Sequence, residues 1–580
     1  MKKKWTLNRI PADYETLARE FLLDPVAIRV LVNRGYDTEE KIREFLSLEE
    51  AVFEKAEGLP DLEKAREEIL RFRDEKKKVR VIGDYDIDGV CATAILLKAF
   101  AALGVDADYV IPHRVLDGYG LNTNLIEQAK ENGIEAIITC DNGIAAFEAV
   151  ELANSYGITV VVTDHHEVPE IIPNAVAVVD PKRKENAYAN REICGAYVAY
   201  KVVCGLLGEP SGEEERRLRT ELRILAGFAT VGDVMPLNAE NRSIVKFCLS
   251  HLKDGINLGL DALIHETDLW EKKLSSHSIG FILGPCINAT GRIDSASNAH
   301  ELLMCKEGNR ARELAVLLKQ MNEERKDLTA KGQEDAVHFV EETCKDDSVI
   351  VLLMPDIHES ITGLVAGRVK EVFYRPTICF TVTEDGKIKG SGRSIEGYDM
   401  YEKLSACKDL FDKFGGHAMA AGITMPEENL ETLRRKLNEE ADLSEEVLTP
   451  ELQIDADMPF AYVTEKLIHD LEKLEPYGVM NEKPVFARKG IEFVEGRIVG
   501  KNKDVGIFTV REPAYGDKTY KLKLFRKLDV FHEYLDQTFG EGTAEGLYRG
   551  KKVSLKIAYF PDLNEFQGHT NIEFILTDYE

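Results

Sequence analysis

Short apolar runs alternate with longer amphipathic stretches over the first half of the chain. Five runs of apolar residues are typical of buried strands, at 79–83, 107–111, 136–140, 159–163 and 175–179. Between them the pattern predicts helices at 90–103, 124–132 and 145–156, which end at Gly104, Gly133 and Gly157. Strands that alternate with helices of this length predict right-handed βαβ units and a mostly parallel sheet.

The second half of the chain changes pattern three times. A long helical stretch over 309–342 is expected to connect two lobes, and a second α/β lobe begins with the apolar run 349–354. Within that lobe we expect Gly415, Gly416 and His417 to open a helix. Short strand-like segments between 485 and 578 predict a small barrel or sandwich. The expected domains are a helical extension (1–75), a catalytic lobe (76–300), a connecting helix (301–345), a second lobe (346–440) and a β-rich domain (455–580).

Composition limits what the chain can be. At 580 residues it is too long for one core, and no apolar run is long enough to cross a membrane, so a cytoplasmic protein is expected. The ten cysteines form no CxxC pair, which predicts reduced thiols and disfavours a cysteine zinc site. The net charge of −28 argues against a nucleic-acid partner, but 481–556 holds 16 bases and 11 acids, a local charge of +5.

Acidic residues and imidazoles gather just past the predicted elements of the first lobe. Asp84, Asp86 and Asp88 follow the first strand, Asp141 follows the third, and Asp164, His165 and His166 follow the fourth, while Asp233 comes after a helical stretch. In a parallel sheet, ligands gather at the carboxyl ends of the strands. This placement predicts one metal site.

Three readings compete for the alternating acids. A calcium loop of the EF-hand type needs Glu at its twelfth position, where this chain has Ile95. The second reading is a solvated acidic turn without a cation. It is disfavoured because the three neighbouring carboxylates would repel one another. Mixed carboxylate and imidazole ligands without thiolates suit two Mn²⁺ or Mg²⁺ ions, which can share a bridging carboxylate and activate a hydroxide for attack on phosphorus. By themselves, these residues support phosphodiester hydrolysis.

The ordered motifs resemble those of the DHH phosphoesterase superfamily. They are Asp84-Tyr-Asp-Ile-Asp-Gly, Asp141-Asn-Gly, Asp164-His-His, Gly232-Asp233 and, in the second lobe, Gly415-Gly-His-Ala-Met-Ala-Ala-Gly422. Three further segments narrow the resemblance to the bacterial single-strand-specific exonucleases of this superfamily. They are Asn288-Ala-Thr-Gly-Arg292, Gly390-Ser-Gly-Arg-Ser394 and Leu474–Phe486. The resemblance covers nearly the whole chain and implies an OB-type tail domain.

The resemblance also implies roles for individual residues. Asp84 and Asp86 would bind a first ion, Asp141 would bridge, and Asp88, His165 and Asp233 would bind a second ion, while His166 would contact the scissile phosphate. The terminal nucleotide and its phosphates would be held by Asn288, Arg292, Arg368, Ser391, Arg393, Gly415, Gly416 and His417. The alternative for each arginine is a surface ion pair. This chain departs from the usual pattern at Gly367, where Ser is common, and at Met480 and Glu482, where Gly and Pro are common.

Taken together, the resemblance implies a Mn²⁺- or Mg²⁺-dependent 5′→3′ exonuclease that degrades single-stranded DNA to nucleoside 5′-monophosphates in recombination and repair. It would be a monomer whose further partners are a single-strand-binding protein and a helicase. One alternative is a phosphodiesterase for short oligonucleotides or cyclic dinucleotides, although shorter relatives of that kind lack a region like 455–580. Another is an inactive DNA-binding scaffold, which the retained acidic residues disfavour.

The tail is expected to hold the strand beyond the site. Four aromatic residues that could stack on nucleobases are interleaved with basic residues. The aromatic residues are Phe493, Phe508, Tyr520 and Phe525, and the basic residues are Arg497, Lys501, Lys503, Arg511, Lys521 and Lys523. The alternative for the aromatic residues is that they fill the barrel core, and we expect this of about half of them.

Overall fold

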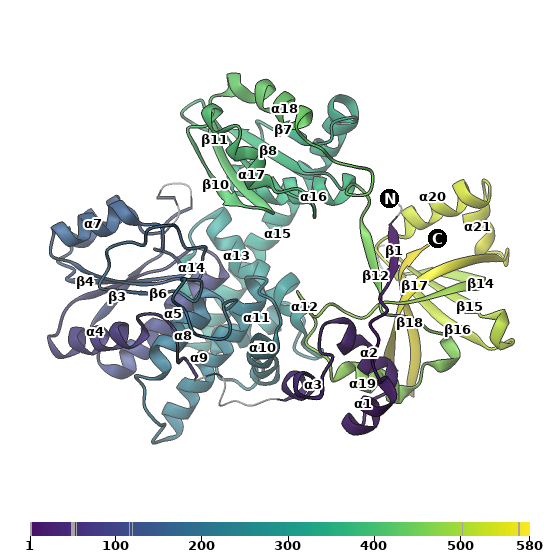
Figure 1. The fold of residues 1–580 in the computed structure, drawn as a ribbon, viewed down its shortest axis with the longest axis horizontal. Helices are drawn as coiled ribbons and strands as arrows, with labels where there is room; N and C mark the ends of the chain where they lie inside the picture. The colour runs from purple at the N-terminus through teal and green to yellow at the C-terminus, as the bar shows by residue number, and fades with distance from the viewer. Residues whose placement is uncertain are drawn as a thin grey trace. The chain divides into compact units, whose positions relative to one another are not determined.

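The computed structural model describes residues 3–47, 53, 55–114, 117–118, 120–500, 503–566 and 569–580. The chain forms two compact units, shown in Figure 1. Unit 1 comprises Met1–Leu48, Leu237–Ala239 and Glu451–Glu580, and unit 2 comprises Glu49–Pro236 and Glu240–Pro450. The expected helical extension 1–75 is therefore divided, because its first part packs with the C-terminal domain and the rest with the first lobe.

The first sheet of unit 2 has five parallel strands in the order β3-β2-β4-β5-β6. The strands are β2 (Val79–Ile82), β3 (Ala107–Val110), β4 (Ala136–Cys140), β5 (Thr159–Thr163) and β6 (Ala177–Val179). The connecting helices are α5 (Ile87–Leu103), α6 (Thr123–Glu131) and α7 (Phe147–Ser155). In Figure 1 the helix α7 lies on one side of this sheet, while α5 and α4 (Leu62–Asp74) lie on the other. The strands are continuous apolar runs because helices cover both faces, which confirms the predicted α/β class.

Helices complete the first lobe and lead to the second. They are α8 (Gly195–Cys204), α9 (Glu213–Gly232), α10 (Ala239–His251), α11 (Leu258–Glu266) and α14 (Ser297–Met304). A further helical stretch runs without a break from α12 (Ser276–Ser278) through the π-helical η2 (Ile279–Leu283) to α13 (Gly284–Ile293). The predicted connecting helix is α15 (Gly308–Phe339).

The second sheet of unit 2 has the order β10-β11-β9-β8-β7. Its strands are β7 (Ile350–Leu353), β8 (Thr377–Val382), β9 (Ile388–Arg393), β10 (Lys413–His417) and β11 (Ala420–Met425), with α16 (Thr362–Phe373), α17 (Met400–Ser405) and α18 (Leu430–Glu439) around it. The prediction that Gly415, Gly416 and His417 open a helix is wrong, because they end β10 in a hairpin with β11. A Cβ on Gly416 would lie 2.3 Å from the Ala420 carbonyl oxygen, so this hairpin requires glycine there.

Unit 1 is built on a closed β-barrel. The order is β13-β14-β15-β16-β18-β17, and a further pairing between β14 and β17 closes it. The barrel strands are β13 (Ala456–Asp457), β14 (Phe486–Val499), β15 (Val505–Arg511), β16 (Thr519–Phe525), β17 (Val553–Phe566) and β18 (His569–Tyr579). The N-terminal β1 (Lys4–Leu7) pairs with β12 (Glu451–Ile454). The remaining helices are α1 (Tyr14–Phe21), α2 (Pro25–Asn33), α3 (Glu39–Leu46), α19 (Glu465–Glu472), α20 (Leu528–Phe539) and α21 (Thr543–Leu547).

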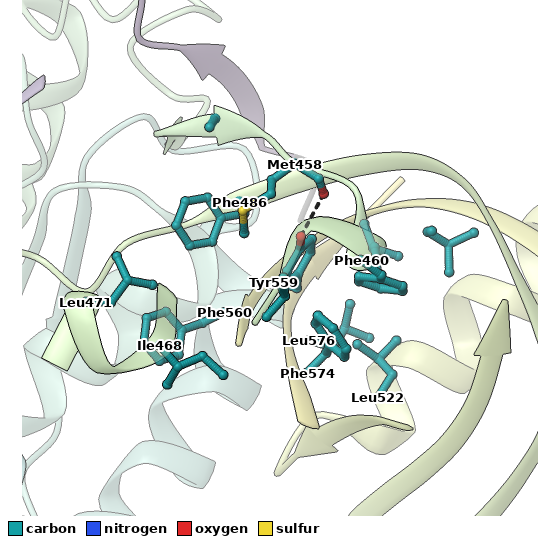
Figure 2. Packing of buried hydrophobic residues seen from close by; sticks show 14 of the residues in the cluster. Met458, Phe460, Ile468, Leu471, Phe486, Leu522, Tyr559, Phe560, Phe574 and Leu576 are labelled. Carbon is teal, nitrogen blue, oxygen red and sulfur yellow. Dashed lines mark hydrogen bonds between the residues drawn. The ribbon is translucent and has the colours of Figure 1, made fainter. Parts of the chain in front are cut away.

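Aromatic rings fill the core of unit 1. Figure 2 shows Phe460 against Phe574, whose ring centroids are 4.1 Å apart. The Tyr559 hydroxyl donates a hydrogen bond to the Met458 carbonyl at 2.7 Å, which satisfies the one polar atom of a buried ring (Figure 2).

The expected base-stacking residues of the tail divide between the core and the surface. Phe493 and Phe508 are fully buried, Tyr520 is partly buried and Phe525 is exposed. Lys501 lies outside the described residues. Nine of the ten cysteines are buried and all are free thiols. No helix in the described part of the chain is both long and apolar enough to cross a membrane.

Candidate active site

The turn from β2 to α5 positions three carboxylates. The Asp86 side chain caps α5 by accepting hydrogen bonds from the amides of Asp88 at 3.0 Å and Gly89 at 3.2 Å. The Asp88 carboxylate accepts hydrogen bonds from the amides of Gly195 at 2.6 Å and Ala196 at 2.8 Å, at the start of α8. A Cβ on Gly89 would lie 2.4 Å from the Asp84 nitrogen, so only glycine lets the turn fold back beside Asp84.

The ends of β4 and β5 add further donors. Asp141 has a left-handed backbone, with φ of 62°. The Asp164 carboxylate accepts hydrogen bonds from the Ile144 amide at 2.9 Å and the His165 amide at 2.8 Å, and it lies 2.7 Å from His166 Nδ1. Asp164 therefore fixes the loop and orients His166.

The structure brings all six predicted metal ligands together. His165 Nε2 lies 3.1 Å from Asp141 Oδ1, 3.6 Å from Asp88 Oδ2 and 3.7 Å from Asp233 Oδ2. The candidate ligand atoms form groups within which every atom lies inside 4.8 Å of the others. These groups are Asp84 with Asp86 and Asp141, Asp88 with His165 and Asp233, and Asp141 with His165 and His166. Asp141 belongs to two of them and so lies where a bridging ligand would.

The clustered acids of the site need a cation to balance their charge. Burial, reinforced by the neighbouring carboxylates, raises the pKa of Asp84, Asp86, Asp141 and Asp233. In the described part of the chain, Asp84 Oδ1 and His165 Nδ1 are buried without a hydrogen-bond partner. Carboxylates with one or two imidazoles and no thiolate are a donor set for Mn²⁺ or Mg²⁺. The residues present therefore fit two such ions.

The pKa values of the two histidines shift in opposite directions. Burial lowers the pKa of His165, which favours the neutral imidazole that a metal requires. Burial also acts against protonation of His166, but its hydrogen bond to Asp164 and the nearby acids raise its pKa to about 9. These contacts favour the protonated imidazole, which suits His166 to contact an anion.

A cluster of guanidinium groups lies beside these acids. Burial, and then Arg114, Arg325 and Arg393, lower the pKa of Arg292 to about 9. Arg292 Nη1 donates to the Ser360 carbonyl at 2.6 Å, and the Arg114 guanidinium lies 3.9 Å from the ring centroid of Tyr85. Within the described residues, neither Arg114, Arg292 nor Arg393 has a carboxylate at ion-pair distance. Partly buried cations without an acidic partner form a site for an anion such as a phosphate.

Four of the eight predicted substrate-binding residues, Asn288, Arg292, Ser391 and Arg393, lie in or near this cluster. Asn288 Oδ1 accepts a hydrogen bond from the Ile87 amide at 2.7 Å, which ties α13 to the acidic turn. Ser391 Oγ lies 3.3 Å from Thr362 Oγ1, and Gly363 leaves room for the Arg393 guanidinium, which a Cβ there would meet at 2.7 Å.

Two predictions fit the structure less well. Arg368 is largely exposed and pairs with Glu371 at 3.0 Å, which is the alternative that the sequence left open. Gly415, Gly416 and His417 are exposed on β10, an edge strand. His417 pairs with Ala420, which pairs with Arg393, so these positions are two strands apart, about 10 Å.

Comparisons with known proteins follow the order of these elements. The model of the DHH family, N-terminal domain, matches residues 78–230, the DHHA1 domain matches 346–442, and the RecJ OB domain matches 454–578. The single-stranded-DNA-specific exonuclease RecJ of Bacillus subtilis is 35% identical over 88% of this chain, which spans 64% of that longer protein. RecJ of Salmonella typhimurium is 31% identical over 100% of this chain and 99% of its own length. The chain belongs to the RecJ family.

The fold agrees with this membership. The structure of RecJ from Thermus thermophilus in complex with Mn²⁺ superposes with a TM-score of 0.81, at 24% identity, over 100% of this chain and 79% of that one. The same RecJ in complex with Mg²⁺ gives a TM-score of 0.74. The likeness extends over both lobes and the barrel domain.

Sequence reasoning missed two arginines of the cluster. Arg114 comes four residues after β3, so it shares the signal that identified Asp141 and Asp164, a polar residue just past a strand. Arg325 lies inside the long helix α15, where a charged residue every few positions is ordinary. No signal in the sequence distinguishes Arg325 from the solvent-facing bases of that helix.

Proposed function

We propose that this RecJ-family protein is a metal-dependent exonuclease that degrades single-stranded DNA from its 5′ end and releases nucleoside 5′-monophosphates. The observation that carries the proposal is a largely buried group of acids and imidazoles next to partly buried guanidinium groups that lack acidic partners. The first requires cations and the second an anion. Metal ions would satisfy the first group, and the terminal phosphate of a strand end would satisfy the second.

In this proposal the acids divide into two sets around Asp141. Asp84 and Asp86 would hold one ion, Asp88, His165 and Asp233 would hold the other, and Asp141 would serve both. Two bound Mn²⁺ or Mg²⁺ ions supply activation of a water and neutralisation of the charge that develops on phosphorus. His166, held by Asp164, donates a hydrogen bond to the scissile phosphate, and its charge opposes that of the phosphate.

The arginine cluster confines cleavage to strand ends. Arg114, Arg292 and Arg393 bind the terminal phosphate, and Asn288 keeps α13 in register with the acidic turn. A terminal phosphate carries more charge than an internal phosphodiester, so a cluster without acidic partners prefers an end. Ser391 and His417 are proposed to contact the terminal nucleotide from β9 and β10.

The presence of the tail domain supports long DNA strands, rather than small molecules, as the substrate. It matches the RecJ OB domain over 454–578, and OB-type barrels bind single strands. An enzyme restricted to single strands depends on a helicase to expose them and meets the single-strand-binding protein that covers them. We therefore propose both as partners of a cytoplasmic monomer acting in recombination and repair.

The test is hydrolysis of single strands labelled at the 5′ or the 3′ end, with Mn²⁺ and with EDTA. We expect a labelled mononucleotide at once from the 5′-labelled strand, no product with EDTA, and slow cleavage of a duplex. Asp141→Ala should reduce turnover by about a thousandfold or more. Normal activity of that variant, or release from the 3′ end first, would contradict the proposal.

Removal of the tail separates the alternative function. A chain of residues 49–450, which lacks the tail and also the N-terminal segment that packs with it, should lose activity on long strands while it still cleaves dinucleotides. If the shortened chain degraded long strands as fast as the full chain, the protein would be a phosphodiesterase of short oligonucleotides.

A further inference from the structure

An aromatic pair stands on the helix that enters the active site. Phe281 exposes 70% of its surface, although its neighbours Ile279, Leu283 and Ile287 are fully buried. The His277 ring stacks on it, with centroids 4.8 Å apart and an interplanar angle of 20°. A single exposed apolar residue is common, but an exposed ring backed by a second parallel ring is a flat platform of the kind that stacks on a base.

The platform faces the same way as the residues of the site. Pro285, Asn288 and Arg292 are three and four residues apart in α13, which is the spacing of one helix face, and Phe281 comes about one turn before Pro285. All three are partly accessible, whereas the positions between them on the opposite face are buried. Phe281 itself lies in the π-helical turn η2, and such turns are often found at functional sites.

The helix therefore orders three features along one line. Arg292 is in the cluster proposed to bind the terminal phosphate, and Asn288 contacts the acidic turn at the metal centre. Phe281 comes about 10 Å beyond Asn288 at 1.5 Å per residue, on the side away from Arg292. That distance corresponds to about three stacked nucleotides.

Charge near the platform suits a nucleic acid. Lys272 and Lys273 are exposed and come just before the helix begins at Ser276. Glu271 precedes them, and the sequence has no acidic residue between Lys273 and Asn288. A strand leaving the metal centre along this face passes from the ring pair to two lysines.

We propose that Phe281, supported by His277, stacks on a base of the strand two or three nucleotides past the scissile bond and positions long strands for cleavage. The inference rests on the proposed exonuclease function and adds to it a site that distinguishes long strands from short ones. A dinucleotide fills the arginine cluster and the metal centre without reaching Phe281.

The test compares kcat/KM for a 5′-phosphorylated 20-nucleotide strand with that for a 5′-phosphorylated dinucleotide, with Mn²⁺. In Phe281→Ala the ratio of the two should fall about tenfold, mainly through KM for the long strand. Phe281→Trp should restore the ratio and Phe281→Leu should not, since stacking needs a ring. Ile171→Ala, which removes an equally exposed apolar side chain elsewhere in unit 2, is the control.

The outcomes separate the two levels of the argument. An active wild type whose ratio is the same in Phe281→Ala, or is restored by leucine, would overturn the platform and leave the exonuclease proposal intact. A wild type inactive on both substrates would overturn the exonuclease proposal and the platform together. A Phe281→Ala protein with a lowered melting temperature and an equal loss on both substrates would assign Phe281 a structural role and also overturn the inference.

Discussion

Two groups of like charge lie partly or fully buried on neighbouring elements of unit 2, the acids around Asp141 and the guanidinium groups around Arg292. Burial shifts the pKa of both towards the neutral form, upward for the acids and downward for Arg292. Each group is held in place by backbone hydrogen bonds, to Asp88 in the first and from Arg292 in the second. The comparison shows that the fold holds two sites of unbalanced charge. Metal ions would neutralise the acids, and a phosphate would neutralise the guanidinium groups.

The largest effect within the cluster is expected from Arg393. Arg393→Ala should lower kcat/KM for 5′-phosphorylated strands by about tenfold to a hundredfold, because a charged hydrogen bond to phosphate is lost. The same variant should bind Mn²⁺ normally. A loss of metal binding in Arg393→Ala would show that the two groups are not separate sites.

Asn288 tests the connection between the groups. Asn288→Ala removes the acceptor for the Ile87 amide, between Asp86 and Asp88, and should weaken Mn²⁺ binding by about tenfold or more. Isothermal titration measures this affinity directly. Asn288→Asp, which keeps an acceptor, should retain more of it, and equal affinity in all three proteins would remove Asn288 from the site.

The raised pKa values of the acids predict how the stability of the metal-free protein depends on pH. An unfolded aspartate has a pKa of about 3.9, and the folded values of Asp84, Asp141 and Asp233 lie well above their usual range. Their contribution to stability is full below the unfolded pKa and is lost as pH rises through the folded pKa. The melting temperature of the metal-free protein should therefore fall as pH rises from 5.5 to 8.5, and the increase caused by Mn²⁺ should grow. A Mn²⁺-induced increase that stays constant over this range would contradict the prediction.

Arg368 should show the smallest effect. Its side chain pairs with Glu371 on the surface of α16, so Arg368→Ala should change kcat/KM by less than about twofold. Measured beside Arg393→Ala, this variant shows which arginines form the cluster. A tenfold loss would mean that Arg368 leaves Glu371 when a strand binds.

The sequence predicted the metal centre far better than the arginine cluster, for a physical reason. Asp84, Asp141 and Asp164 follow buried strands, and parallel strands bring their carboxyl ends to one edge, so local pattern implied spatial proximity. The cluster gathers Arg114 from a loop, Arg292 and Arg325 from two helices and Arg393 from a strand of another sheet. Only tertiary packing brings them together. The hairpin at Gly416 was mistaken for a helix because glycine there meets a close backbone approach that no local pattern reveals.

The most direct test of the account is a titration of metal-free protein with Mn²⁺, with free Mn²⁺ followed by electron paramagnetic resonance. We expect two bound ions in the wild type and weaker binding of both in Asp141→Asn, because Asp141 groups with Asp84 and Asp86 and also lies 3.1 Å from His165 of the second set. Asp233→Asn should weaken one ion and leave the other. A single bound ion in the wild type, or two ions that bind Asp141→Asn as tightly, would contradict a centre built around Asp141.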